Sequence, residues 1–211
     1  MAADPGRLGI DFPLFPLALV TLPTELVPLH IFEERFKTMI DECIDGDREF
    51  GIVWLADDEL LDVGCACRVD RVIERMDDGR INLIARGTRP FRILERRSHL
   101  PYPAGTVEFL ADVAEALDPA LQQTAHTAYA QLVTRATDRT PDQAELDALD
   151  AYAMAATVDF GLEVKQRLLE LRSERARLAL VTRLLRAALK RLDFVDRAQA
   201  RARSNGKVRF G

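Results

Sequence analysis

The stretch VPLHIFEERF, residues 27–36, marks the point where the chain turns into a helix. From Phe32 onward the apolar residues recur with the period of an α-helix and not in alternation. They stand at positions 32, 36, 39, 40, 43 and 44. Glu33 and Glu34 fall in the first turn, where a carboxylate stabilises the positive end of the helix dipole. Gly46 is expected to end the helix.

His30 raises a chemical alternative for the same stretch. Together with Glu33 and Glu34 it has the composition of half a metal site or of an acid–base pair. The spacing His-x-x-Glu-Glu lacks the second histidine of the zinc motif His-x-x-Glu-His, and that histidine is a required ligand. The other histidines, His99 and His126, lie in a predicted loop and in the acidic helical half. We therefore expect a structural role for His30, with no catalytic residue and no metal ligand.

The first half of the chain has the pattern of a β domain. Short runs of β-branched and aromatic residues alternate with Pro and Gly up to residue 111. The predicted strands cover residues 49–56, 65–76, 80–95 and 105–113. Asp78-Gly79 between two of them predicts a hairpin. Gly87 interrupts the next strand and predicts a bulge with a positive φ.

From Asp118 onward the pattern is helical. The predicted helices cover residues 118–137, 142–159, 163–172 and 174–192. The expected fold class is α+β, with a small β-barrel that holds one inserted helix and a helical bundle after it. The expected boundaries are an N-terminal tail at 1–11, a β domain at 12–114, a helical bundle at 115–195 and a basic flexible tail at 196–211.

The composition is that of a soluble globular protein. Of the 211 residues, 48% are hydrophobic and 30% are charged. No apolar run approaches the ~20 residues that cross a bilayer, and the N-terminus lacks the pattern of a signal peptide. The cysteines are three, an odd number, which does not favour a disulfide framework. We expect a cytoplasmic protein without membrane association.

The sequence lacks the common motifs of enzymes and zinc sites. Gly206–Lys207 has no Gly-rich loop before it, so it is not a P-loop, and no Gly-x-Ser-x-Gly elbow occurs. Cys65 and Cys67 share one face of a predicted strand, but a zinc site normally needs a second pair, and Cys43 is the one further thiol. We expect reduced, buried cysteines, no zinc and no cofactor.

The segment FPLFPLALVTLPTELVPLHIFEERFKTMI, residues 12–40, closely resembles the opening of the Lon protease N-terminal domain family. The Pro-Leu-x-Pro-Leu start of that family corresponds to Pro13–Leu17, and its Pro-Leu-His-Ile-Phe-Glu segment corresponds to Pro28–Glu33. Asp78–Gly79–Arg80 at the hairpin and Lys165–Gln166 in the helical half are further matches. The resemblance covers residues 12–192, and its motifs are specific in combination.

This resemblance implies a PUA-like β domain followed by a helical bundle. It also implies recognition of unfolded or degron-bearing polypeptide segments. In full-length Lon an ATPase and a Ser-Lys protease follow this domain, whereas this chain ends at residue 211. The expectation is therefore a stand-alone, non-enzymatic substrate-recognition module or adaptor in protein quality control. Its expected partners are client polypeptides, and a protease complex is a further candidate partner.

The candidate peptide-binding residues lie in the opening segment. They are Phe15, Leu17, Leu29, His30, Phe32, Glu34, Arg35 and Phe36. The proline-punctuated strands of this segment are expected to offer exposed edges to an added peptide strand. For Phe32 and Phe36 a place in the core is the favoured alternative. Glu34 and Arg35 lie on the outer side of the helix, where no core requires them.

RNA binding is the alternative function, because RNA-binding modules share the PUA-like fold. The charge would come from the arginines of the predicted hairpin, which are Arg68, Arg71, Arg75, Arg80, Arg86 and Arg89. Asp70, Glu74, Asp77 and Asp78 lie among them and dilute the positive field, and interleaved aromatic residues are absent. Nucleic acid is therefore not an expected partner. An adaptor for a protease or a ligase is a third hypothesis.

Overall fold

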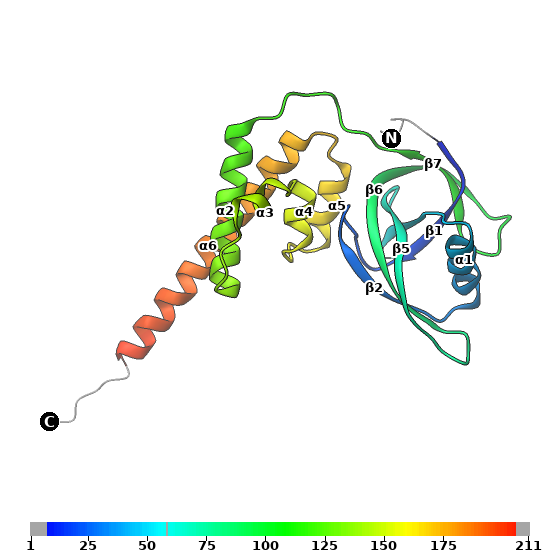
Figure 1. Ribbon diagram of the computed structural model, residues 1–211, viewed down its shortest axis with the longest axis horizontal. Helices are drawn as coiled ribbons and strands as arrows, with labels where there is room; N and C mark the ends of the chain where they lie inside the picture. The colour runs from blue at the N-terminus through cyan, green and yellow to red at the C-terminus, as the bar shows by residue number, and fades with distance from the viewer. Residues whose placement is uncertain (1–7, 58, 206–211) are drawn as a thin grey trace. The chain divides into compact units, whose positions relative to one another are not determined.

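The computed structural model describes residues 8–57 and 59–205, and in this part of the chain strands come first and helices follow (Figure 1). The strands are β1 (Leu8–Leu17), β2 (Leu26–Ile31), β3 (Phe50–Ala56), β4 (Glu59–Leu60), β5 (Val63–Arg75), β6 (Ile81–Arg97) and β7 (Ala104–Phe109). The helices are α1 (Glu34–Asp45), α2 (Pro119–Thr137), α3 (Gln143–Asp147), α4 (Ala151–Ala156), α5 (Leu162–Glu170) and α6 (Glu174–Asn205). Because α1 is inserted between β2 and β3, the predicted α+β class with one inserted helix is confirmed.

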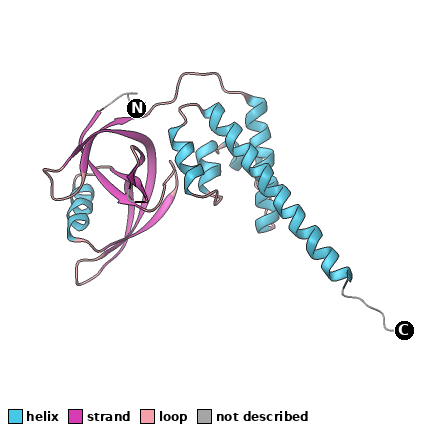
Figure 2. Ribbon diagram, turned by 180° about the vertical axis from the view of Figure 1, so that it is seen from behind, coloured by secondary structure: helices cyan, strands magenta, loops and turns pink. Residues whose placement is uncertain are grey.

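Five strands close into a ring by hydrogen bonding, and Figures 1 and 2 show how they curve around it. The order around the ring is β1, β7, β6, β5, β3 and back to β1. The β1–β3 ladder is parallel, and the other ladders of the ring are antiparallel. β2 lies off the ring and pairs with β6 from Leu26↔Arg86 to Ile31↔Ile81. Since this is the one ladder that β2 forms among the described residues, β2 is an edge strand.

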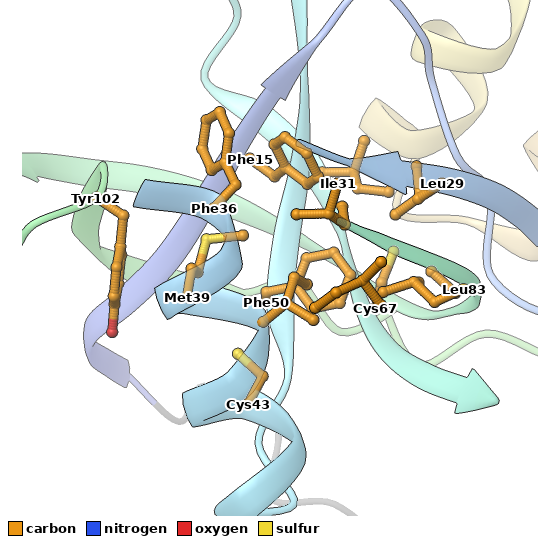
Figure 3. Packing of buried hydrophobic residues seen from close by; sticks show 14 residues of the cluster. Phe15, Leu29, Ile31, Phe36, Met39, Cys43, Phe50, Cys67, Leu83 and Tyr102 are labelled. Carbon is orange, nitrogen blue, oxygen red and sulfur yellow. The ribbon is translucent and has the colours of Figure 1, made fainter. Parts of the chain in front are cut away.

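The apolar face of α1 packs against strands of the ring (Figure 3). Phe36, Met39, Ile40 and Cys43 are buried, which confirms the helical stripe predicted from the sequence. The ring of Phe36 lies against that of Phe15 from β1, with 4.3 Å between their centroids. Burying one large apolar side chain stabilises a fold by about 1.5–3 kcal/mol, so this face holds α1 in place.

The turn between β5 and β6 is the predicted hairpin. Gly79 has a φ of 81°, in the left-handed region that glycine adopts without strain. Met76 N donates to the Arg80 carbonyl and Gly79 N donates to the Met76 carbonyl, each at 2.9 Å. Lys37 of α1 donates to the carbonyl of Asp78 at 3.1 Å and thereby ties the helix to the hairpin.

Gly87 lies at a bulge, as predicted, but the reason for a glycine there differs from the prediction. The register of β5 and β6 shifts between Ala66↔Arg89 and Cys67↔Gly87. The φ of Gly87 is not positive, and that part of the prediction is wrong. A Cβ at this position would lie 2.1 Å from the carbonyl oxygen of Leu22. Glycine is therefore required because another backbone segment approaches closely.

The helical half differs from the sequence-based expectation at two places. The helix predicted over 142–159 is broken into α3 and α4, although no Gly or Pro occurs between residues 143 and 158. α6 continues to Asn205, so the first part of the tail expected at 196–211 is helical, and the remainder lies outside the described residues. At the other end, β1 begins at Leu8, inside the segment expected as a tail at 1–11.

The chain divides into two compact units. The first contains the strands, α1 and residues Tyr152–Glu174, which include α5. The second contains Ala116–Ala151 and the chain from Arg175 onward, that is α2, α3 and nearly all of α6. The expected boundary between residues 114 and 115 therefore falls close to a change of unit, but residues 152–174 return to the unit of the strands.

We predict that Gly87→Ala lowers the free energy of unfolding by about 2–3 kcal/mol, because overpacking of this size forces the backbone to shift. Arg92→Ala, an exposed position on the same strand, is the control and should change stability by less than about 0.5 kcal/mol. Urea unfolding followed by circular dichroism measures both. Equal stability of the Gly87→Ala protein and the wild type would show that the backbone at Leu22 is free to move.

Candidate functional site

Three of the eight residues predicted to bind peptide are buried, and a fourth is half-buried. Phe15, Leu29 and Phe36 are buried in the core cluster under α1, and Leu17 is half-buried against the same cluster. Alternation along a strand places one set of side chains in the core, which explains Phe15 and Leu29. These residues therefore form the support of a surface and not the surface itself. The expectation that Phe36 is a core residue is confirmed.

Phe32 is exposed, contrary to the expectation that it joins the core. Its side chain is 60% exposed, whereas Ile31 beside it is buried. The helical phase begins only at Glu34, so Phe32 lies between β2 and α1 and belongs to the apolar face of neither element. Glu33 precedes α1 in an extended conformation and makes no side-chain cap. An aromatic side chain thus projects where strand and helix meet.

His30 is linked by hydrogen bonds across three strands. Its Nδ1 lies 2.7 Å from Oδ1 of Asn82 on β6, directly opposite in the ladder. The amide of Asn82 donates to Glu74 of β5 at 3.2 Å, so its oxygen is the acceptor toward His30. The imidazole also stacks on Phe32, with 5.9 Å between ring centroids. His30 orients the exposed aromatic ring and lies next to no nucleophile among the described residues.

Glu34 and Arg35 lie exposed at the start of α1, as predicted. Arg35 pairs with Glu33 at 2.7 Å, and Glu34 pairs with Lys37 at 2.8 Å. The Arg35–Glu33 pair is exposed, and a pair of this kind contributes about 0–1 kcal/mol, whereas the Lys37 side chain that pairs with Glu34 is only 12% exposed. The guanidinium of Arg35 also lies over the ring of the core residue Phe36, 4.6 Å from its centroid, whereas the Glu34 side chain is almost fully exposed.

An outward-facing surface runs along β2 to the start of α1. We name it the corner surface, and its residues are Leu26, Pro28, His30, Phe32, Glu34 and Arg35, all exposed. Ile84 of β6 lies opposite Pro28 in the ladder and is half-buried. The surface thus combines apolar side chains, an edge strand and two charges. Pro28 has no N–H, which leaves the edge one backbone donor fewer.

A mostly buried ion pair fixes the position at which β2 begins. Lys165 of α5 donates to Oε1 of Glu25 at 2.5 Å, and the two side chains are 15% and 14% exposed. Gln166 donates to the carbonyl of Val63 at 3.0 Å. The adjacent residues Lys165 and Gln166 therefore attach α5 to the turn before β2 and to the start of β5. The sequence identified this pair as a motif but did not show its partners.

Comparison with known proteins agrees with this architecture. Residues 11–187 match the family described as the ATP-dependent protease La (LON) substrate-binding domain. The protein belongs to this family. In the chain this domain is found, and no protease or ATPase domain is found with it. In this Lon substrate-binding domain, the corner surface lies within residues 12–40, the segment that resembles the opening of the family.

Two solved structures are similar to this Lon substrate-binding domain. The Lon N-terminal domain protein from Xanthomonas campestris is 25% identical, with a TM-score of 0.62 over 80% of this chain and 94% of the other. The N-terminal domain of the Mycobacterium avium complex Lon protease is 21% identical, with a TM-score of 0.63 over 85% of this chain and 98% of the other. The second likeness supports the fold alone.

The cysteines of this Lon domain are buried, as predicted. Burial raises the pKa of the Cys43 thiol to about 11 and that of Cys67 well above its ordinary value. Cys65 is likewise buried. Among the described residues, no cluster of His, Cys, Asp and Glu is arranged to hold a metal ion. The same residues include no helix that is both long and apolar enough to span a bilayer.

We predict that the three thiols do not react with Ellman's reagent in the folded protein near neutral pH, because the thiolate is the reactive form. In guanidinium all three should react at once. The contribution of Cys43 to the free energy of unfolding should be fully present below the ordinary thiol pKa of about 8.5. It should decline as the pH rises from there toward the folded-state pKa of about 11, because the thiol ionises at lower pH in the unfolded chain than in the folded protein. One equivalent of fast-reacting thiol in the folded protein would contradict this assignment.

Proposed function

We propose that this protein binds unfolded or degron-bearing polypeptide segments through the corner surface and catalyses no reaction. Its role would be that of a substrate-recognition module or adaptor in protein quality control. Membership of the Lon substrate-binding domain family supports polypeptides as the class of ligand. The single observation that carries the choice of surface is the exposure of Phe32, whose ring is held by His30 beside an edge strand.

The corner surface has the features that an extended apolar segment requires. Phe32 offers a large ring at low entropic cost, because stacking on His30 already restricts it. The unpaired side of β2 can accept backbone hydrogen bonds from an added strand. Glu34 and Arg35 follow Phe32 in the chain at the start of α1 and carry opposite charges, which favours segments in which apolar and polar residues are mixed. A preformed surface of this kind needs no rearrangement of the core beneath it.

Catalysis has no support in the surroundings of the corner surface. The one titratable ring there, His30, is engaged with Asn82, and the three cysteine thiols of the chain are buried. Nucleophilic catalysis needs a nucleophile within hydrogen-bond reach of a base. No such pair is formed at this place by the described residues. We therefore include the absence of an enzymatic activity in the proposal.

RNA binding gains no support from the arginine-rich hairpin. Arg75, Arg80, Arg86 and Arg89 are each paired with a carboxylate at 2.6–2.8 Å. These pairs neutralise most of the charge that would attract a phosphate backbone. We retain polypeptide binding as the one proposed function.

The test uses an unstructured peptide that carries two clusters of Leu and Phe, is amidated at its C-terminus and bears a fluorophore. Phe32→Ala should weaken its binding at least about fivefold in fluorescence anisotropy, because truncating an aromatic anchor costs about 1 kcal/mol or more. The melting temperature should stay within about 2 °C, since the side chain supports no core.

Ile73→Ala is the matched control, because Ile73 is an apolar side chain of the same 60% exposure on β5, outside the corner surface. It should bind the peptide like the wild type. Equal binding by the Phe32→Ala and wild-type proteins would exclude the corner surface. Absence of peptide binding by the wild-type protein at high micromolar concentration would contradict the function itself.

A further inference from the structure

A concave site lies in the unit of the strands. It is a groove of about 660 Å³, within the usual range of ligand pockets. Its walls come from the first half of β1, the loop between α1 and β3, and the strands β5, β6 and β7. None of its lining residues belongs to the corner surface. We call it the arginine groove.

The floor of the arginine groove is aromatic and rigid. Phe12 and Phe109 are nearly buried, and their rings meet edge to face with centroids 5.4 Å apart. The guanidinium of Arg89 lies over the Phe109 ring at 3.8 Å. Leu8, which is 54% exposed, stands at the rim. An apolar side chain could therefore rest between Leu8 and the aromatic floor without any rearrangement.

One carboxylate of the groove is already occupied. Glu49 accepts a hydrogen bond from Thr88 at 2.7 Å and from Arg89 at 2.8 Å. The Thr88 hydroxyl also lies 2.9 Å from the Ala66 carbonyl. The buried Nε of Arg89 has no hydrogen-bond partner among the described residues. Glu49 therefore fixes Arg89 in place but does not use all of its donors.

Two further guanidinium groups line the groove without an ion-pair partner in the described part of the chain. They belong to Arg48, in the loop before β3, and to Arg68 of β5. The pairing of Phe50 with Cys67 brings the ends of these two segments side by side. Asp47 is the one other carboxylate in the lining, so three arginines face two acids. The groove thus has an excess of positive charge above an apolar floor, a combination that attracts a carboxylate attached to an apolar group.

The backbone of β1 adds a third feature. On one side, Leu8 and Gly9 pair with β7. On the other side, the ladder with β3 starts only at Leu14↔Gly51, and among the described residues no strand pairs with that edge of β1 before Leu14, which leaves a free edge. A short extended chain can pair with such an edge. Because this free edge is short and the groove is small, the end of a chain fits it better than a long internal segment.

We infer that the arginine groove binds the free C-terminus of a polypeptide that ends in an apolar residue. The terminal carboxylate bonds to Arg68 and Arg48, the last side chain lies on Phe12 and Phe109, and the preceding backbone pairs with β1. This inference rests on the proposed function, since it names a second class of polypeptide determinant for the same protein. The inference assigns recognition of the free C-terminus to the arginine groove, which is separate from the corner surface.

The test compares two forms of one short, fluorophore-labelled peptide that ends in Leu, one with a free C-terminal carboxylate and one amidated. The wild-type protein should bind the free acid at least about tenfold more tightly, because hydrogen bonds to a charged group contribute about 1.5–3 kcal/mol. Arg68→Gln should remove this preference. Arg48→Gln is an independent second variant that should reduce it. A peptide with an internal Glu and an amidated end separates a terminal carboxylate from a side-chain carboxylate.

Arg71→Gln is the matched control, since Arg71 is an exposed arginine on the same strand that has no ion-pair partner among the described residues and lies outside the groove. It should retain the full preference for the free acid. Equal affinity for acid and amide in the wild type would overturn the inference, as would a preference that survives both Arg68→Gln and Arg48→Gln. The amidated peptide with Leu and Phe clusters, read out by Phe32→Ala, reports on the corner surface independently, so failure of the groove leaves that result intact.

Discussion

Glu25 accepts hydrogen bonds from three different segments, and the arrangement of the unit that contains the strands depends on these bonds. Its carboxylate accepts from Leu22 N at 2.9 Å and from Lys165 at 2.5 Å, and its carbonyl accepts from Gly87 N at 2.9 Å. The turn over residues 22–25 is thereby pressed onto β6, so closely that only glycine fits at position 87. A charge that is mostly buried in this way is costly unless it is paired, and Lys165 supplies the pair. α5 is therefore needed by the strands, which explains why residues 152–174 belong to their unit.

The position of this turn also determines where the corner surface lies. β2 begins at Leu26, immediately after Glu25, and its register on β6 places His30 opposite Asn82. The same register makes Ile31 a core residue and leaves Phe32 outside both the strand and α1. Exposure of an aromatic side chain is thus a consequence of where the strand starts and where the helix begins. The core cluster beneath gives this surface a rigid support, as a preorganised binding site requires.

Local patterns in the sequence predicted many of the elements, although not the break between α3 and α4 or the start of β1 at Leu8, and they failed where distant segments meet. The helical stripe of α1 and the hairpin at Gly79 could be predicted, because the signal lies within a few residues. Phe32 was misplaced because its spacing fits the helical period although the helix starts at Glu34. Gly87 was correctly identified as special, but its contact is with Leu22, which no local pattern shows. The arginine groove was missed for the same reason, since its arginines come from three separate segments.

The most direct test of this account is a double-mutant cycle on Glu25 and Lys165. Urea unfolding would give the free energies of the wild type, Glu25→Gln, Lys165→Met and the combined variant. Because both side chains are mostly buried, each single change should destabilise by about 2–3 kcal/mol, and the coupling energy should be about 1–2 kcal/mol. Hydrogen exchange at the Gly87 amide should accelerate in both single variants. A coupling energy within about 0.3 kcal/mol of zero, with unchanged exchange at Gly87, would contradict the claim that this pair fixes the start of β2.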